Sequence, residues 1–275
     1  MKNKDYPGSV ELSVEDSPEG LVARLTIDNR AKLNILNSLL IEQLISAVAG
    51  LYGDERLRVL ILTGAGNRAF IGGADVNEMA GLNPDSAREF ISRLHDACAA
   101  LRSLPVPVIA RINGYCLGAG LEIAASCDLR VASEGSTFGM PEVKVGIPSV
   151  IEAALLPTLI GWGRSRELLL TGRQITADSA LAWGLVERVV SADDLDSLVG
   201  DWVRAILEAG PRAVRLQKAL IREWEKLPLD QAIERGIEAF SEAFTTREPK
   251  RLMDRFLMRS RHSKRDRHSE PDRPS

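Results

Sequence analysis

The sequence contains few of the residues on which metal sites, disulfide frameworks and nucleophilic catalysis depend. Its 275 residues include 3 cysteines and 3 histidines. The cysteines, Cys98, Cys116 and Cys127, are odd in number and lack the paired spacing of a metal site, so we expect reduced, buried thiols. Cys116 lies near a glycine-rich turn, but no histidine is close to it in sequence to activate it as a nucleophile. We therefore expect these thiols to serve in packing.

The histidines are also poorly placed for catalysis. His95 follows the apolar positions of a predicted helix and is expected to face water, whereas His262 and His268 belong to a polar tail. Glycine-rich nucleotide motifs are missing as well, because no Gly-Lys-Ser/Thr follows the glycines of residues 64–73 and these do not match the dinucleotide fingerprint. The sequence therefore argues against a P-loop or dinucleotide site.

Long apolar runs and a strong net charge are also absent. No run approaches the ~18 apolar residues of a membrane span, and the first residues have no apolar core of signal-peptide length. The net charge is -3 with a pI of about 5.8, which gives no global basic field for nucleic acid. We expect a soluble, cytoplasmic protein with no membrane partner and with nucleic acid an unlikely one.

The hydrophobic pattern predicts a layered α/β core followed by a helical region. With 45% hydrophobic residues the chain can bury a large core in one or two domains. Strands and helices alternate up to Pro148, and helices dominate after it. The predicted strands are residues 10–14, 21–27, 58–63, 107–112 and 129–132; the predicted helices are 36–53, 84–104, 121–126, 152–160, 164–170, 176–183, 193–209, 211–226, 229–244 and 249–260.

A glycine-rich turn between a strand and a short helix is the most distinctive stretch of the chain. Gly114, Gly118 and Gly120 free the backbone before the helix that holds Glu122. Backbone amides at a helix N-terminus can stabilise an oxygen that gains negative charge. An acid in the first turn can equally be a simple charge–dipole pairing, and position alone favours that interpretation of Glu122.

A second acid, Glu142, favours a catalytic interpretation over a simple charge–dipole pairing. Glu142 follows a proline in an otherwise apolar stretch, Ser-Thr-Phe-Gly-Met-Pro-Glu at residues 136–142. Burial there would raise the pKa of its carboxyl group and suit it to proton transfer near neutral pH.

Four blocks of the sequence resemble the signature of the crotonase (enoyl-CoA hydratase/isomerase) superfamily. They are Phe-Ile-Gly-Gly-Ala-Asp-Val-Asn-Glu-Met at 70–79, Gly-Ala-Gly-Leu-Glu-Ile-Ala at 118–124, Cys-Asp at 127–128 and Phe-Gly-Met-Pro-Glu at 138–142. Their order and spacing agree over nearly the whole chain, up to about Arg261. The resemblance implies an α/β fold in which ββα units wind into a superhelix, with a C-terminal helical trimerisation region.

The resemblance also implies the chemistry and the residues that perform it. Glu122 and Glu142 match the family's two catalytic acids, and the backbone amides of Ala74 and Ala119 match its oxyanion hole. The reaction would be reversible addition of water to a 2-enoyl-CoA thioester, a lyase activity without metal or redox cofactor, in which coenzyme A is part of the substrate. The positions that match the family's substrate and coenzyme A contacts are Lys32, Leu33, Gly73, Asp75, Val76, Asn77, Gly118 and Arg259.

One segment departs from the family pattern. Many hydratases have a Pro-Gly-x-Gly-Gly turn after the second acid, whereas Pro148 is followed here by Ser-Val-Ile-Glu. This change should reshape the acyl pocket or its mouth, and Glu152 is interpreted as the first-turn acid of the next helix. A double-bond isomerase or an acyl-CoA decarboxylase on the same fold remains an alternative.

The C-terminal part of the chain gives further predictions. We expect residues 1–192 to form the core with the active site, 193–260 a helical region for assembly into a trimer or a dimer of trimers and for covering the site, and 261–275 a disordered tail without apolar residues. The apolar stripe of Ile233, Ile237, Phe240 and Phe244 is of a kind that is usually core. A non-catalytic or RNA-binding relative is the remaining alternative, through the basic stretch 250–267.

Overall fold

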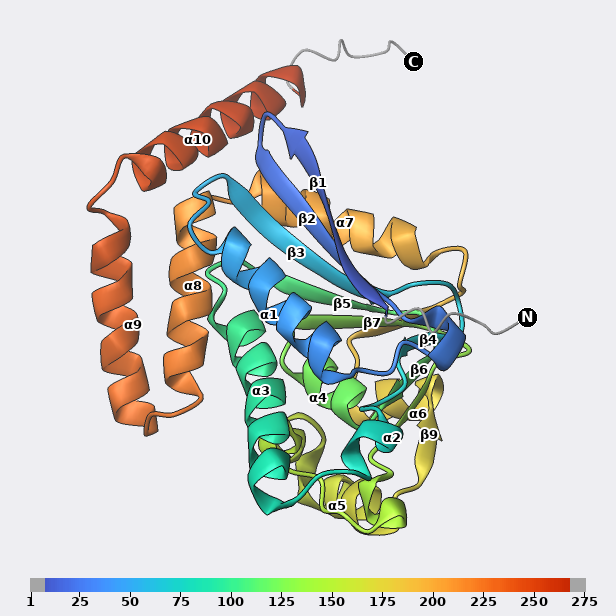
Figure 1. Ribbon diagram of the computed structural model, residues 1–275. Helices are drawn as coiled ribbons and strands as arrows, with labels where there is room; N and C mark the ends of the chain where they lie inside the picture. Colours follow the sequence, from blue (N-terminus) through green and yellow to red (C-terminus); the bar gives the residue numbers. More distant parts are fainter. Residues whose placement is uncertain (1–7, 268–275) are drawn as a thin grey trace. The chain divides into compact units, whose positions relative to one another are not determined.

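The computed structural model describes the backbone of residues 8–267 and the side chains of residues 8–258. The chain forms two compact units that divide between Ile206 and Leu207. The first unit contains two sheets and the helices around them, and the described part of the second contains helices without strands. Figure 1 shows the elements with the labels used below.

The first unit is built on a six-stranded sheet and a four-stranded sheet. The large sheet has the order β1-β2-β3-β5-β7-β10 and the small sheet the order β4-β6-β8-β9. All neighbouring strands are parallel except the pairs β1–β2 and β8–β9. The large-sheet strands are Ser9–Ser17, Gly20–Asp28, Leu57–Gly64, Val108–Ile112, Leu129–Ser133 and Arg188–Val190; the small-sheet strands are Ala69–Ile71, Tyr115–Leu117, Thr137–Gly139 and Gln174–Thr176.

The order of the strands reveals a repeating ββα unit. Strands β3, β5 and β7 are neighbours in the large sheet, and the strand that follows each of them, β4, β6 and β8, joins the small sheet. Each repeat thus adds one strand to both sheets before the chain returns through helices. The predicted α/β fold with ββα units winding into a superhelix is confirmed by this topology.

Helices connect the repeats. In the first unit these are α1 (Ser38–Leu51), α2 (Val76–Met79), α3 (Pro84–Ser103), α4 (Ala119–Ala125), α5 (Leu156–Thr171), α6 (Ala177–Trp183) and α7 (Leu195–Glu208), with 3₁₀ turns η1 (Arg30–Lys32), η2 (Glu142–Val145) and η3 (Ile151–Leu155). Asn83 caps α3 before Pro84 as the sequence predicts. Gly161 has a non-helical φ of 78° inside α5, so the helix is interrupted there.

The core lies between the large sheet and the helices α1 and α3, which lie side by side across it in Figure 1. All residues of β3 are buried, as expected for a parallel strand covered on both faces. The apolar stripe of α1, which includes Leu40, Leu44 and Val48, packs into this core.

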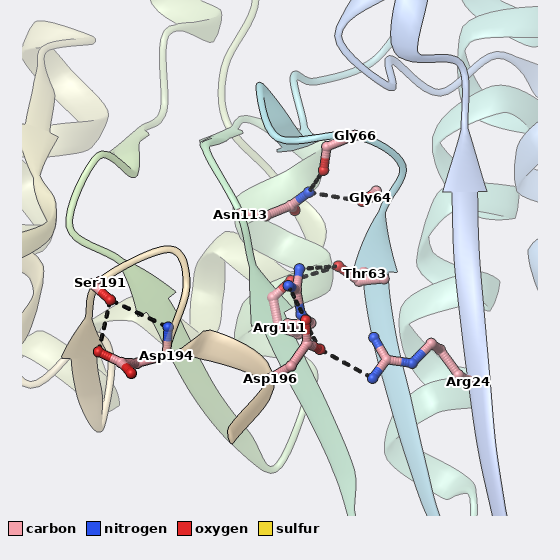
Figure 2. Close-up of polar contacts among 9 residues, drawn as sticks. All are labelled: Arg24, Thr63, Gly64, Gly66, Arg111, Asn113, Ser191, Asp194 and Asp196. Carbon is pink, nitrogen blue, oxygen red and sulfur yellow. Dashed lines mark hydrogen bonds and ion pairs between the residues drawn. The ribbon is translucent and has the colours of Figure 1, made fainter. Parts of the chain in front are cut away.

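Helix α7 begins on the first unit, which moves the predicted boundary at residue 192. Figure 2 shows the carboxylate of Asp196 between Arg24 of β2 and Arg111 of β5, the two strands that flank β3. It accepts hydrogen bonds from Arg111 Nε at 2.8 Å and Nη2 at 2.6 Å, and from Arg24 Nη2 at 3.2 Å. Leu195 and Val199 are buried. The start of α7 therefore belongs to the core, and the division falls inside this helix.

The ends of β3 and β5 are also joined by side chains. Figure 2 shows Asn113 beside the loop that follows β3. Its Nδ2 donates to the carbonyl oxygens of Gly64 at 2.8 Å and Gly66 at 2.5 Å, and the Thr63 hydroxyl donates to the Arg111 carbonyl at 2.9 Å. These bonds fix the loop that leads into β4, which precedes the glycine pair of the site.

The second unit contains α8 (Pro211–Trp224), α9 (Leu229–Ala243) and α10 (Glu248–Arg267). Trp224 Nε1 donates to the carbonyl of Ala232 at 2.8 Å, which joins α8 to α9. The stripe on α9 is not core within one chain, because its side chains, Ile233, Ile237, Phe240 and Phe244, are 52% to 69% exposed. Helical spacing of apolar residues indicates that one face of the helix is to be buried, but it does not identify the surface that buries it.

The C-terminal tail departs in part from its prediction. Disorder is predicted from residue 261, whereas the backbone of α10 is helical to Arg267. The physical reason is that arginine and lysine have good helix propensity, so the helix continues without an apolar face. Residues 268–275 lie outside the described residues.

Candidate active site

The candidate site lies where three neighbouring parallel strands of the small sheet end. Strand β4 leads into Gly72, Gly73 and Ala74, strand β6 into the glycine turn before α4, and strand β8 into the segment that carries Glu142. The carboxyl ends of adjacent parallel strands meet at one edge of a sheet, which is a common place for a ligand site. The topology thereby joins three motifs that are far apart in the sequence.

Hydrogen bonds to Leu36 fix the direction of the Ala74 backbone amide. The carbonyl of Gly73 accepts a hydrogen bond from the Leu36 amide at 2.8 Å, and the Asp75 amide donates to the Leu36 carbonyl at 2.8 Å. In a planar trans peptide the N–H points opposite to the C=O. The Ala74 N–H therefore points away from Leu36 and is not used by this short ladder.

The amide of Ala119 is left open by its place in α4. Ala119 is the first residue of that helix, so its N–H has no acceptor inside the helix. The carbonyl of Gly118, in the same peptide group, accepts from Leu121 at 2.8 Å and Glu122 at 3.1 Å. The Ala119 N–H therefore points out of the N-terminal end of α4.

Gly118 lets these segments and the second acid approach one another. Its φ of 51° and ψ of −120° are a glycine conformation. A Cβ built there would lie 2.5 Å from Oε1 of Glu142 and 4.0 Å from Cα of Gly73. The Gly73 and Gly118 segments, which lead into Ala74 and Ala119, are thus adjacent, and a Glu142 oxygen lies beside Gly118.

Glu122 is a buried acid with an unusual proton affinity. It lies in the first turn of α4 and is 4% exposed. Burial, followed by the negative charge of Glu142, raises the pKa of Glu122 from 4.5 to about 8. The Ala153 amide donates to its Oε1 at 3.3 Å and opposes this rise. The raised pKa favours the protonated form of Glu122 near neutral pH, whereas a simple charge–dipole pairing favours the ionised form.

Glu142 begins the turn η2 and faces a hydroxyl group. The Ser149 Oγ donates to its Oε2 at 2.7 Å. Its other oxygen lies beside Gly118, and its charge contributes to the shifted pKa of Glu122. The fold thus brings Glu122 and Glu142 together, as the sequence predicts, over a separation that sequence spacing alone does not bridge.

A third acid, Glu152, has the predicted position but also a contact that was not predicted. It is in the first turn of η3, as expected of a first-turn acid, but it is 7% exposed and belongs to the surroundings of Glu122. Its Oε1 lies 2.9 Å from Nδ1 of His95. His95, on α3, is partly exposed as predicted, but sequence reasoning missed its contact with Glu152.

Known proteins with similar sequences identify the family. The model for enoyl-CoA hydratase/isomerase matches residues 18–265. The chain belongs to the enoyl-CoA hydratase/isomerase family. It is 38% identical over 240 residues to the short-chain-enoyl-CoA hydratase of Clostridium acetobutylicum, covering 87% of this chain and 92% of that protein, and 36% identical to the crotonyl-CoA hydratase of Syntrophomonas wolfei with the same coverage.

A solved structure agrees with this assignment. The enoyl-CoA hydratase from Bacillus anthracis superposes with a TM-score of 0.85 at 33% identity, over 90% of this chain and 96% of that one. The resemblance to the crotonase superfamily, inferred from four sequence blocks, is therefore confirmed.

The loop that holds Lys32 and Leu33, two of the predicted substrate contacts, lies along the Gly72–Ala74 segment. The carbonyl of Leu33 accepts from the Gly72 amide at 2.9 Å. Leu33 and Asn34 have positive φ values of 57° and 54°, and Asn34 Nδ2 donates to the Ala69 carbonyl at 2.8 Å. Lys32 is exposed on this loop. The fold therefore places Lys32 and Leu33 next to the segment that holds Gly73.

The remaining predicted contacts lie on α2 and α10. Asp75 caps α2, because its Oδ1 accepts from the Asn77 amide at 2.9 Å. Val76 and Asn77 are exposed at the start of the same helix. The side chain of Arg259 lies outside the described side chains.

The three thiols behave as packing residues. Cys98, Cys116 and Cys127 are free and buried, and burial raises the pKa of Cys98 and Cys116 well above the usual range. Within the described part of the chain, His, Cys, Asp and Glu form no group of three or more that could hold a metal ion, and no helix is long and apolar enough to cross a membrane.

Proposed function

We propose that this protein is an enoyl-CoA hydratase that adds water across the 2,3 double bond of a 2-enoyl-CoA thioester. The observation that carries the proposal is the pair of acids at one edge of the small sheet, where Glu122 is buried in α4 and an oxygen of Glu142 lies beside Gly118, the residue before the open Ala119 amide. Relatives named short-chain-enoyl-CoA hydratase and crotonyl-CoA hydratase support the same reaction.

The amides of Ala74 and Ala119 would stabilise the thioester oxygen. Addition of hydroxide at the β-carbon moves negative charge onto that oxygen, and two preorganised N–H donors lower the energy of this state. The N-terminal end of α4 adds the positive end of its dipole at Ala119. Methyl groups on both residues leave the donors unchanged, so alanine serves as well as glycine there.

The two glutamates would divide the proton transfers. In the free enzyme Glu142 can accept a proton from a water held between the pair, while Glu122 can donate its proton to the α-carbon. The hydroxyl group of that water then forms the bond to the β-carbon. Because one proton is taken up and one is given, the pair as a whole keeps its single proton through the addition.

Substrate binding would use the loop of Lys32 and Leu33 together with the residues after β4, Gly73, Asp75, Val76 and Asn77. No cofactor is needed, because coenzyme A arrives as part of the substrate. We further propose a homotrimer or a dimer of trimers, since exposed apolar side chains follow α9. In such an assembly Arg259 would approach the coenzyme A phosphates of a neighbouring subunit.

The test compares hydration of crotonyl-CoA by wild type, Glu122→Gln and Glu142→Gln. The rate is measured from the loss of the 2-enoyl absorbance, and the product is identified by mass spectrometry. Each amide variant keeps size and should lower kcat by roughly 10²-fold or more. The double variant should fall far short of the product of the two losses, because the residues act as a unit. Glu19→Gln, an exposed acid in the β1–β2 turn, is the matched control.

Product analysis separates hydration from isomerisation. A saturated acyl-CoA should still bind both variants, because the amides of Ala74 and Ala119 are untouched. If Glu142→Gln hydrates crotonyl-CoA within about threefold of wild type, Glu142 is not part of the mechanism. A product with a moved double bond and no added water would make the protein an isomerase acting through Glu122.

A further inference from the structure

The segment after Pro148 holds the second acid of the site through a side chain. The Ser149 hydroxyl donates a hydrogen bond to Glu142 Oε2 at 2.7 Å, and both residues are half-buried. Many hydratases have a glycine after this proline, and a glycine has no hydroxyl group to make the bond. The departure from the glycine-rich turn therefore gives this chain a direct contact with Glu142.

The backbone between Glu142 and Ser149 forms a short closed loop. The Glu142 carbonyl accepts from the Ile147 amide at 3.2 Å, and the Val143 carbonyl accepts from the Gly146 amide at 3.3 Å. Gly146 has a φ of 83°, the left-handed conformation that lets the chain reverse here. Ser149 thus reaches Glu142 across a turn that is held by its own hydrogen bonds, so the hydroxyl group is in place before a substrate binds.

The same segment also contacts the first acid. Four residues after Ser149, the Ala153 amide donates to Glu122 Oε1 at 3.3 Å. Between these two contacts Ile151 has a φ of 37°, a conformation that costs a β-branched residue free energy and persists only where the surroundings impose it. A strained segment that donates one hydrogen bond to each acid is expected to fix the position of one acid relative to the other.

The two carboxyl oxygens of Glu142 have different surroundings. Oε2 accepts from Ser149, whereas Oε1 lies beside Gly118, where a Cβ would be 2.5 Å from it. Gly118 precedes the open amide of Ala119. The bond to Oε2 restricts rotation about the last side-chain torsion, which is otherwise broad in glutamate. Oε1 is therefore held toward the glycine turn, where the thioester is expected to bind.

We propose that Ser149 is a positioning residue that holds the carboxyl group of Glu142 so that Oε1 is the oxygen that exchanges a proton with the substrate water. The inference rests on the proposed function of Glu122 and Glu142. During hydration an O–H bond of the water breaks, its proton moves to Oε1, and the remaining hydroxyl group bonds to the β-carbon, while Glu122 supplies the proton of the α-carbon. Ser149 keeps its own proton throughout and acts only through Glu142.

The first test compares kcat and KM for crotonyl-CoA in wild type, Ser149→Ala, Ser149→Gly and Ser149→Thr. The alanine and glycine variants should lower kcat by roughly tenfold, the scale of one hydrogen bond to a charged group. Their KM should stay within about twofold, because the amides of Ala74 and Ala119 are untouched. Threonine keeps the hydroxyl group and should restore kcat to within about threefold of wild type. Ser13→Ala, at an exposed serine on β1, is the matched control and should change neither constant.

The second test is a double-mutant cycle with Glu142. A residue that acts only through Glu142 has no further effect once that acid is lost. Adding Ser149→Ala to Glu142→Gln should therefore change kcat by less than about twofold, whereas the same substitution in wild type lowers it roughly tenfold. A merely structural role of Ser149 would lower kcat by the same factor in both backgrounds. Urea unfolding of every variant checks that it is folded under the assay conditions.

The outcomes separate the positioning role of Ser149 from the proposed function. If Glu142→Gln loses roughly 10²-fold in kcat while Ser149→Ala and Ser149→Gly stay within about twofold of wild type, the positioning role alone is overturned. Equal losses from Ser149→Ala in both backgrounds, or a threonine variant as slow as the alanine variant, also overturn it. A wild type that hydrates no enoyl-CoA, or a Glu142→Gln variant that keeps its rate, overturns the proposed function and the positioning role together.

Discussion

The unfolding free energy of Glu122→Gln should increase relative to that of wild type as the pH rises. The pKa of Glu122 is about 8 in the folded chain and 4.5 as a reference, so the folded state binds this proton more tightly than the unfolded state. Stability from this group is fully present below pH 4.5 and is lost as pH rises through 8. The whole shift corresponds to about 5 kcal/mol. Glutamine does not titrate and escapes this loss.

Between pH about 6 and about 9 the difference in unfolding free energy between Glu122→Gln and wild type should change by roughly 3 kcal/mol in favour of the variant. The assay is urea unfolding at both pH values and at equal protomer concentration. Glu19→Gln, an exposed acid, should show no such change. A difference between Glu122→Gln and wild type that is the same at both pH values would refute the raised proton affinity of Glu122.

Two further predictions concern Gly118 and α9. Gly118→Ala should lower kcat by roughly 10²-fold, because the new Cβ would lie 2.5 Å from Glu142 Oε1. The control Gly66→Ala, at a glycine with φ of 75° and open space around it, should lose stability but keep its rate. Equal rates in the two variants would contradict the role of Gly118. Light scattering should give a mass that is a multiple of three protomers of 30.0 kDa, and Phe240→Glu should shift it toward one protomer; a monomeric wild type would refute the proposed assembly.

Much of the local structure follows from nearby residues. The capped start of α3 at Asn83 and Pro84, the glycine turn before α4 and the strand β3 all match their predictions. Each depends on side chains and backbone conformations within a few residues, which is why the sequence specifies them.

The short strands of the small sheet could not be predicted in the same way. Strands β4, β6, β8 and β9 have three residues each, too few to show a period. They exist because neighbours far along the chain supply their hydrogen bonds. Since the site lies at the ends of three of these strands, the distances between its residues could not be predicted from the sequence and depend on the tertiary structure.

The sequence by itself determined the family and the fold class and pointed to Glu122 and Glu142 as the candidate acids, because these depend on motifs with fixed spacing. Only the tertiary structure decided that Glu152 and His95, 57 residues apart, meet beside Glu122, that α7 begins on the core through Asp196, and that the stripe of α9 is exposed. The physical reason is that burial and charge interactions are set by what surrounds a residue in space, and spacing along the chain does not encode those neighbours.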